Sequence, residues 1–185
     1  MHKRWKVMAI ALIVLVATLV GTQSLAYYTA HGIATNVVTS GDIALTIHEK
    51  TADGADFPAE GVNVIPGDVV DKIVTVENSC AHPFYLRVKL VNSSSSDSLL
   101  PQDCLQVDLN TAAWTLREDG YIYYNRVLQA GETTEPVFTQ VTVSGQALTR
   151  EDIGTTLGLT VKAYAVQSAH NTAANPWEAS GWPQE

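Results

Sequence analysis

Alternation of apolar and polar residues is the feature that most constrains what this chain can fold into. Successive side chains of a β-strand point to opposite faces of a sheet, so a period of two places all apolar residues on one face. The segment from residue 84 to residue 90 follows this pattern, with Phe84, Leu86, Val88 and Leu90 on one face and Tyr85, Arg87 and Lys89 on the other. It predicts a strand with one buried face.

Further strands are predicted where this alternation recurs or where β-branched residues dominate, in the segments 43–48, 69–77, 105–109, 137–143 and 157–167. Residues 114–117 and 121–124 flank Glu118-Asp119-Gly120. Asp-Gly supplies the positive φ of a tight turn, which predicts a hairpin. The only plausible helix start, at Thr149–Asp152, is followed closely by glycines. We therefore expect eight or nine strands, almost no helix, and an antiparallel β-sandwich.

The N-terminus has the features of a signal peptide. Three basic residues among the first six precede an apolar run from Val7 to Val20. A helix needs about 20 apolar residues to cross the core of a bilayer, so this run is short for a transmembrane helix. Ser24 and Ala26 are small residues two positions apart, which suits a signal peptidase. We predict a signal peptide over residues 1–26, cleaved between Ala26 and Tyr27; an uncleaved anchor is the alternative.

The charge of the chain excludes one class of partner. The 185 residues include 46% hydrophobic and 16% charged residues, which favours a folded domain over a disordered chain. The formal net charge is −8, and no basic cluster occurs outside the leader, so we expect no nucleic-acid partner. Three of the eleven cations and none of the nineteen acids lie in the leader, so cleavage leaves a net charge of −11. We expect one domain over residues 36–167 and a C-terminal tail over residues 168–185.

Two cysteines, Cys80 and Cys104, are present in the chain. In an oxidising exterior an even number permits one bridge, which would close a loop of about 25 residues. We predict a Cys80–Cys104 disulfide, with two free thiols as the alternative.

A search for catalytic constellations finds little. No two histidines of the processed chain have the spacing of helical zinc ligands: His31, His48, His82 and His170. His48-Glu49 opens like a metalloprotease motif, but no second histidine follows where that motif requires it. The acids of one Gly/Pro-bearing loop, Asp53, Asp56 and Glu60, lack EF-hand spacing and favour a solvated acidic face over a calcium site. We expect no enzyme, no cofactor and no metal.

The end that cleavage would create is a better functional candidate. It begins Tyr27-Tyr28-Thr29 and continues through small and polar residues to Thr35, before a first strand expected at residues 36–38. A β-prone end can pair with an open strand edge of another copy. A disordered tail is the alternative.

Several short motifs together give the chain a family resemblance. They occur in order over nearly the whole sequence, at residues 21–29, 36 with 41–43, 66–72, 76–78, 85–88, 114 with 119–124, 128–134 and 163–167. In these segments the chain resembles the TasA/camelysin (CalY) family of Gram-positive exported proteins, which a SipW-type signal peptidase processes.

The resemblance implies a jelly-roll-like sandwich that is secreted to the cell surface or biofilm matrix. The last residues contain neither an apolar tail nor a basic end, so we expect no membrane attachment after cleavage. It implies a fibre subunit or an accessory protein whose partners are other copies, a longer family member and, during export, the SipW-type peptidase. The donor strand would lie in residues 27–35, with Tyr27, Tyr28, Thr29 and Ile33 as candidates. A camelysin-like secreted metalloprotease is the alternative, although the helical zinc signature is missing.

Overall fold

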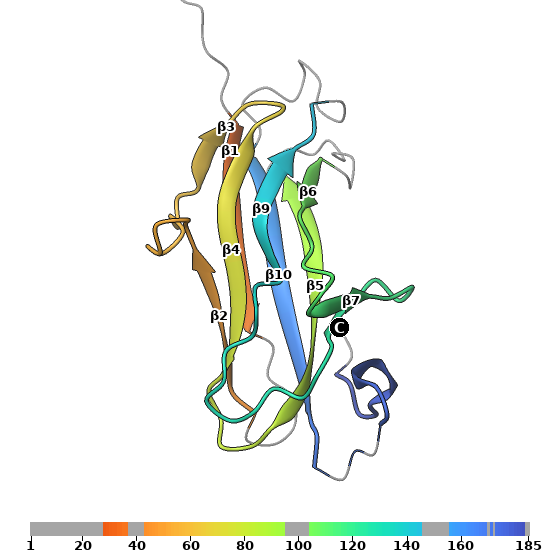
Figure 1. Ribbon diagram of the computed structural model, residues 1–185. Coiled ribbons are helices and arrows are strands. Elements are labelled where there is room, and N and C mark those ends of the chain that lie inside the picture. The colour runs from red at the N-terminus through yellow and green to blue at the C-terminus, as the bar shows by residue number, and fades with distance from the viewer. Residues whose placement is uncertain are drawn as a thin grey trace, which may run out of the picture.

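The structure, a computed structural model, describes residues 28–36, 43–94, 104–145, 156–169, 171 and 173–183. Strands dominate the described part of the chain (Figure 1). The elements are β1 Tyr28–Asn36, β2 Leu45–Lys50, β3 Val62–Val64, β4 Val69–Asn78, β5 Phe84–Ser94, β6 Leu105–Val107, β7 Trp114–Leu116, β8 Ile122–Tyr124, β9 Phe138–Val143, β10 Thr156–Gln167 and a single-turn 3-10 helix, η2 Pro176–Glu178.

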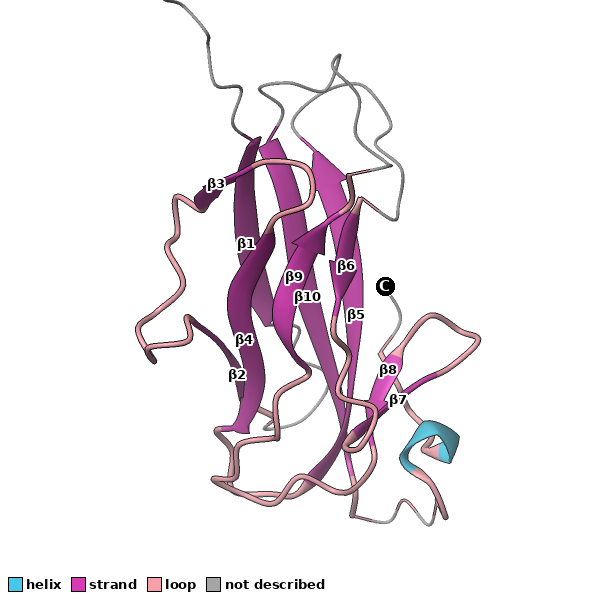
Figure 2. Ribbon diagram, turned by 45° about the horizontal axis from the view of Figure 1, so that its top comes forward, coloured by secondary structure: helices cyan, strands magenta, loops and turns pink. Residues whose placement is uncertain are grey.

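Two sheets pack face to face (Figure 2). The larger sheet has the strand order β3-β1-β10-β5-β8-β7, and the smaller has β2-β4-β9-β6. All described strand pairs are antiparallel except β1 and β10, which run parallel. The predicted all-β sandwich is confirmed. No helix within the described ranges is long and apolar enough to span a membrane, and the expected helix start at Thr149–Asp152 lies outside them.

The alternating residues form the core as the sequence predicts. Leu86 and Val88 of β5 are completely buried, as are Leu157 and Val161 of β10. These two strands form a ladder of eleven residue pairs from Leu157↔Ser94 to Gln167↔Phe84 at the centre of the larger sheet. Burying one such aliphatic side chain contributes about 1.5–3 kcal/mol, so the inward face of this ladder anchors the sandwich.

The predicted hairpin is present as β7 and β8, with Trp114↔Tyr124 as one of its register pairs. Gly120 in its turn has a φ of 78°, a conformation that glycine adopts without a steric cost. The Asp119 carboxylate accepts a hydrogen bond from the Tyr121 backbone N–H at 3.1 Å and another from the Tyr123 hydroxyl at 2.7 Å. The Asp-Gly turn therefore also fixes the aromatic side chains that follow it.

The first strand differs from the expectation. Residues 28–35 are not a free N-terminal segment but form most of β1, within the larger sheet. The first strand expected at residues 36–38 is found only at Asn36, because Val37 and Val38 lie outside the described residues. The physical reason is that one edge of β10 pairs with β1 over eight residues, although β10 lies more than 100 positions further along the chain. No local pattern reveals such a pairing.

The residues after β10 form a tail that joins neither sheet in the part of the chain that is described. The tail runs beside the β7–β8 hairpin and contains η2 (Figure 2). The Asn171 side chain closes a loop within the tail, since its amide donates to the Ser180 carbonyl at 3.1 Å and its oxygen accepts from the Ser180 N–H at 3.3 Å.

Candidate assembly site

The N-terminal strand β1 fills a position between β3 and β10 in the larger sheet. It runs beside β10 from Thr29 to Asn36 (orange and blue in Figure 1). Eight residue pairs, from Thr29↔Thr156 to Asn36↔Ala163, form the parallel ladder. Three pairs, from Tyr28↔Val64 to Ala30↔Val62, join β1 to β3. Among the described residues, the strand is therefore flanked on both sides at its beginning and by β10 alone from residue 31 onward.

The strand beside β1 belongs to the core. Leu157 and Val161 of β10 are fully buried, and the register places Ala30 and Ala34 of β1 opposite them. Without β1, the β10 backbone from Thr156 to Ala163 would lose the ladder on one side. Exposed strand edges of this kind are templates for pairing with another chain.

Three of the four donor-strand candidates lie in β1. The register pairs Tyr28 with Val64, Thr29 with Thr156 and with Asn63, and Ile33 with Thr160. Tyr27 and the cleavage position at Ala26 lie outside the described residues. The structure therefore assigns the backbone of the candidate donor segment to a strand position within its own chain.

A short connection links β1 to the rest of the fold. Six residues, 37–42, separate Asn36 from Ile43, after which the chain enters β2 of the other sheet. Six extended residues span at most about 20 Å. A β1 strand that leaves its own sheet can therefore reach only an immediately adjacent copy.

The predicted disulfide is not present in the structure. Cys80 and Cys104 are both thiols. Cys80 lies just after β4, whereas Cys104 precedes β6, and Leu105 of β6 pairs with Val143 beside the other end of β4. The two cysteines therefore lie at opposite ends of the ten-residue strand β4, which is about 30 Å long. A disulfide requires Cα atoms within about 7 Å of each other. The prediction of an intrachain bridge is wrong for this fold.

A polar interaction network accounts for the position of Cys80. Its Sγ and its backbone N–H lie 2.9 and 3.0 Å from Oδ1 of the fully buried Asn78. The Asn78 amide group donates to the carbonyl oxygens of His82 and Leu128 at 2.9 and 3.2 Å. Cys80 therefore belongs to the connection between β4 and β5, which Asn78 organises. Sequence reasoning missed Asn78, because one asparagine at a strand end carries no distinct signal.

The described histidines, His31, His48 and His82, form no metal-binding group. His48 lies on β2 and contacts Glu77 of β4 at 2.8 Å. His31 lies in β1, His82 lies in the loop after β4, and His170 is outside the described residues. Across residues 28–36, 43–94, 104–145 and the described part beyond 156, no three His, Cys, Asp or Glu side chains form a metal-binding group.

The acidic side chains of the loop between β2 and β3 contact neighbouring residues of the same segment. Lys50 Nζ lies 2.6 Å from the Asp56 carboxylate. The hydrogen bond and the charge of Lys50 lower the pKa of Asp56 below its usual value. Asp53 accepts a hydrogen bond from Thr51, and Glu60 is exposed. These contacts fix a surface turn.

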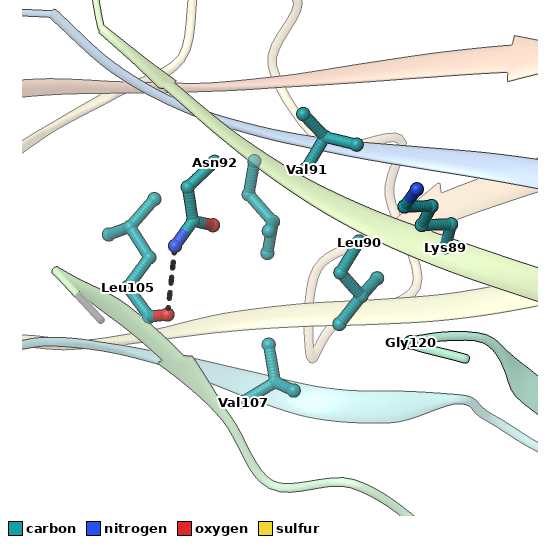
Figure 3. A pocket seen from close by; sticks show the side chains of 8 residues that line it. Lys89, Leu90, Val91, Asn92, Leu105, Val107 and Gly120 are labelled. Atoms are coloured by element: carbon teal, nitrogen blue, oxygen red, sulfur yellow. Dashed lines mark hydrogen bonds between the residues drawn. The ribbon is translucent and has the colours of Figure 1, made fainter. Parts of the chain in front are cut away.

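A cleft of about 460 Å³ opens between the two sheets on the side of β5 and β6 (Figure 3). Figure 3 shows Leu90 of β5 and Val107 of β6 directed towards one another. The Asn92 amide donates to the Leu105 carbonyl at 3.5 Å across the cleft. The volume is in the range of small-ligand sites, but the lining offers mainly apolar contact: Lys89, Leu90, Val91, Asn92, Leu105, Val107, Gly120 and Leu159.

The arrangement defines an all-β sandwich with a terminal strand in parallel register beside its last strand. Comparisons of the chain with protein-family models, with curated proteins and with solved structures find no match.

Proposed function

We propose that this protein is a secreted structural protein of the cell surface or biofilm matrix, and that copies associate by exchanging β1. The observation that carries the proposal is the position of β1, a terminal strand held by a backbone ladder to β10. Every copy has the same position, so β1 of one copy can form the same ladder in a neighbour. The resemblance to the TasA/camelysin family supports the same assignment.

Exchange of β1 between copies keeps the backbone pairing that stabilises a chain whose β1 lies in its own sheet. The eight pairs with β10 and the three with β3 can form within one chain or between two copies. Protein concentration and the geometry of residues 37–42 then decide which form dominates. Passing β1 from copy to copy in one direction is a heterologous contact, which produces an open filament when the rotation does not close. Repeated exchange of β1 from copy to copy would give a fibre, whose copies are its subunits. A single exchange of β1 would give an accessory protein that caps another chain.

Cross-linking at the register of β1 and β10 tests the proposal directly. One variant carries Ile33→Cys and a second carries Thr160→Cys, both starting at Tyr27 and both with Cys80→Ser and Cys104→Ala. Neighbouring strands lie about 4.8 Å apart, which permits a disulfide between register partners. We expect that mixing the two variants under mild oxidation gives a covalent dimer on non-reducing electrophoresis.

Two controls make this experiment decisive. Ile33→Cys mixed with Thr142→Cys, which lies on β9 of the other sheet, should give little dimer. The second control is a single chain that carries both Ile33→Cys and Thr160→Cys. A bridge within this chain shows that β1 pairs with β10 of the same chain. If only that double variant forms the bridge and the mixture never does, β1 stays within its own chain and the proposal fails.

Removal of β1 gives an independent measurement. A chain that starts at Val37 lacks the donor strand, so we expect assemblies in sedimentation and electron micrographs only for the chain that starts at Tyr27. Identical monomeric behaviour of the two chains would contradict strand exchange. Zinc-dependent casein cleavage by clean recombinant protein would instead favour the metalloprotease alternative.

A further inference from the structure

The outward face of the larger sheet contains a guanidinium group surrounded by aromatic rings. Arg87 of β5 is only 8% exposed. Its Cζ lies 3.7 Å from the centroid of the Tyr121 ring, 5.5 Å from that of Tyr164 and 6.0 Å from that of Tyr123. Its Nη1 donates to the Tyr123 hydroxyl at 3.2 Å. These partners come from β8, its preceding turn and β10, so the backbone ladders of the sheet hold them in place.

The C-terminal tail covers this cluster. The ring of Trp182 lies 4.7 Å from Arg87 Cζ and meets the Tyr123 ring edge-on at 5.6 Å. Arg87 Nη2 donates to the Pro183 carbonyl at 3.1 Å. A second tryptophan of the tail, Trp177, lies 5.1 Å from Arg117 Cζ. The contacts of the tail thus include two tryptophan–arginine contacts, the Pro183 carbonyl and hydrogen bonds from the Tyr85 hydroxyl to the carbonyls of Asn171 and Ala173.

Charge complements the aromatic contacts. Lys89 and Lys162 are register partners on the same outward face, and Lys89 Nζ lies 5.3 Å from the Tyr121 ring centroid. The tail beyond residue 170 contains glutamates but no lysine or arginine. A segment with tryptophans and glutamates but no cations therefore contacts a face that carries an arginine, two lysines and three tyrosines.

The described part of the tail packs on the outward face of the larger sheet without joining its backbone ladders. It contributes no strand to either sheet in the described ranges, and Asn171 and Ser180 close it upon itself. The face that receives it is built by β5, β8 and β10, whose pairing does not involve the tail. Cation–π contacts of arginine with tryptophan are among the stronger contacts of this type, especially when desolvated.

We propose that this face, which we call the tail-binding face (Arg87, Lys89, Tyr121, Tyr123, Lys162 and Tyr164), is a binding site for an acidic Trp-Pro peptide segment. The chain's own tail occupies it, and the tail of a second copy can take its place. The site would link copies through side chains on the outward face of the larger sheet, whereas exchange of β1 uses the backbone edge of β10; the two meet at Lys162, the register partner of Thr35.

Competition between the attached tail and a free tail peptide tests the proposal in the full chain. The probe is a fluorescent peptide of residues 171–185, and its binding is measured by anisotropy. An attached tail competes at high effective concentration, so the wild-type chain should bind the peptide weakly. Trp182→Ala in the chain weakens the attached tail, and we expect this variant to bind the probe at least tenfold more tightly.

Specificity is tested by charge reversal and by the peptide itself. In the Trp182→Ala chain, Lys162→Glu should weaken binding of the probe, whereas Lys50→Glu on the other sheet should leave it unchanged. A probe that carries Trp182→Ala should bind at least tenfold more weakly than the wild-type probe. Equal affinity of the wild-type and Trp182→Ala chains, or equal affinity of the two probes, would overturn the proposal.

A second design covers failure of the Trp182→Ala chain to fold, which thermal unfolding would reveal. A protease site inserted after Ala169 is cut in the folded wild-type chain, and the labelled peptide is then added in excess. Exchange of the cut tail for the peptide supports the site. A cut tail that is never replaced, or that leaves without the peptide binding, contradicts it.

Discussion

At the scale of single residues, the sandwich contains a buried ion pair that alternation does not predict. Lys72 of β4 and Glu49 of β2 lie 2.9 Å apart, with side chains 3% and 12% exposed. Lys72 Nζ also lies 4.8 Å from the Phe57 ring centroid. Burial lowers the pKa of Lys72, and the charge of Glu49 opposes that shift. Each charge of this pair depends on the other, because neither is well solvated.

Removal of one partner should therefore be costly. We expect Glu49→Ala to lower the free energy of unfolding by about 3 kcal/mol, because it leaves a buried ammonium group without a carboxylate. The double variant Glu49→Leu/Lys72→Met should be close to the wild type, since it removes both charges and keeps apolar volume. Urea unfolding measures both. Equal losses for the single and double variants would show that packing, and not charge pairing, stabilises this position.

At the scale of elements, short edge strands need support beyond their own ladders. β6 has only three residues, and Asp108 directly after it reinforces the contact with β9. The Asp108 carboxylate accepts hydrogen bonds from the backbone N–H groups of Thr139 and Gln140 at 2.8 and 2.6 Å. Desolvation raises the pKa of Asp108, but hydrogen bonds from Thr139 and Gln140 outweigh it, and the pKa is lower than usual.

This lowered pKa predicts an acid dependence. The folded state binds fewer protons at Asp108 than the unfolded state, so the contribution of Asp108 is present above its unfolded pKa, about 3.9. That contribution disappears as the pH falls through the folded value. We expect urea unfolding between pH 5 and pH 3 to show a larger loss of stability for the wild type than for Asp108→Asn. Parallel curves for the two proteins would contradict the role of the carboxylate.

At the scale of the whole molecule, net charge opposes association between copies, whereas the cations of the tail-binding face favour it. A chain that starts at Tyr27 carries a formal net charge of −11, so its copies repel one another at low salt. Strand exchange relies on backbone pairing and apolar burial, which salt does not screen. The tail-binding face instead attracts an acidic segment through cations.

Salt should therefore separate the two proposed contacts. For the chain that starts at Tyr27, raising the salt concentration from about 10 mM to about 150 mM reduces the screening length about fourfold. We expect self-association in sedimentation to strengthen over that range, and binding of the tail peptide to the Trp182→Ala chain to weaken. Self-association that is strongest at the lowest salt would argue against strand exchange as its main contact.

The amino-acid sequence alone predicts the all-β class, the core faces of β5 and β10, and the hairpin at Asp119-Gly120. These features depend on side-chain period and on turn chemistry, which are properties of neighbouring residues. Tertiary structure alone decided that β1 pairs in parallel with β10 and that Cys80 and Cys104 lie at opposite ends of β4. It also decided that the tail covers Arg87. These features join residues far apart in sequence, so only the packing of the two sheets determines which of them meet.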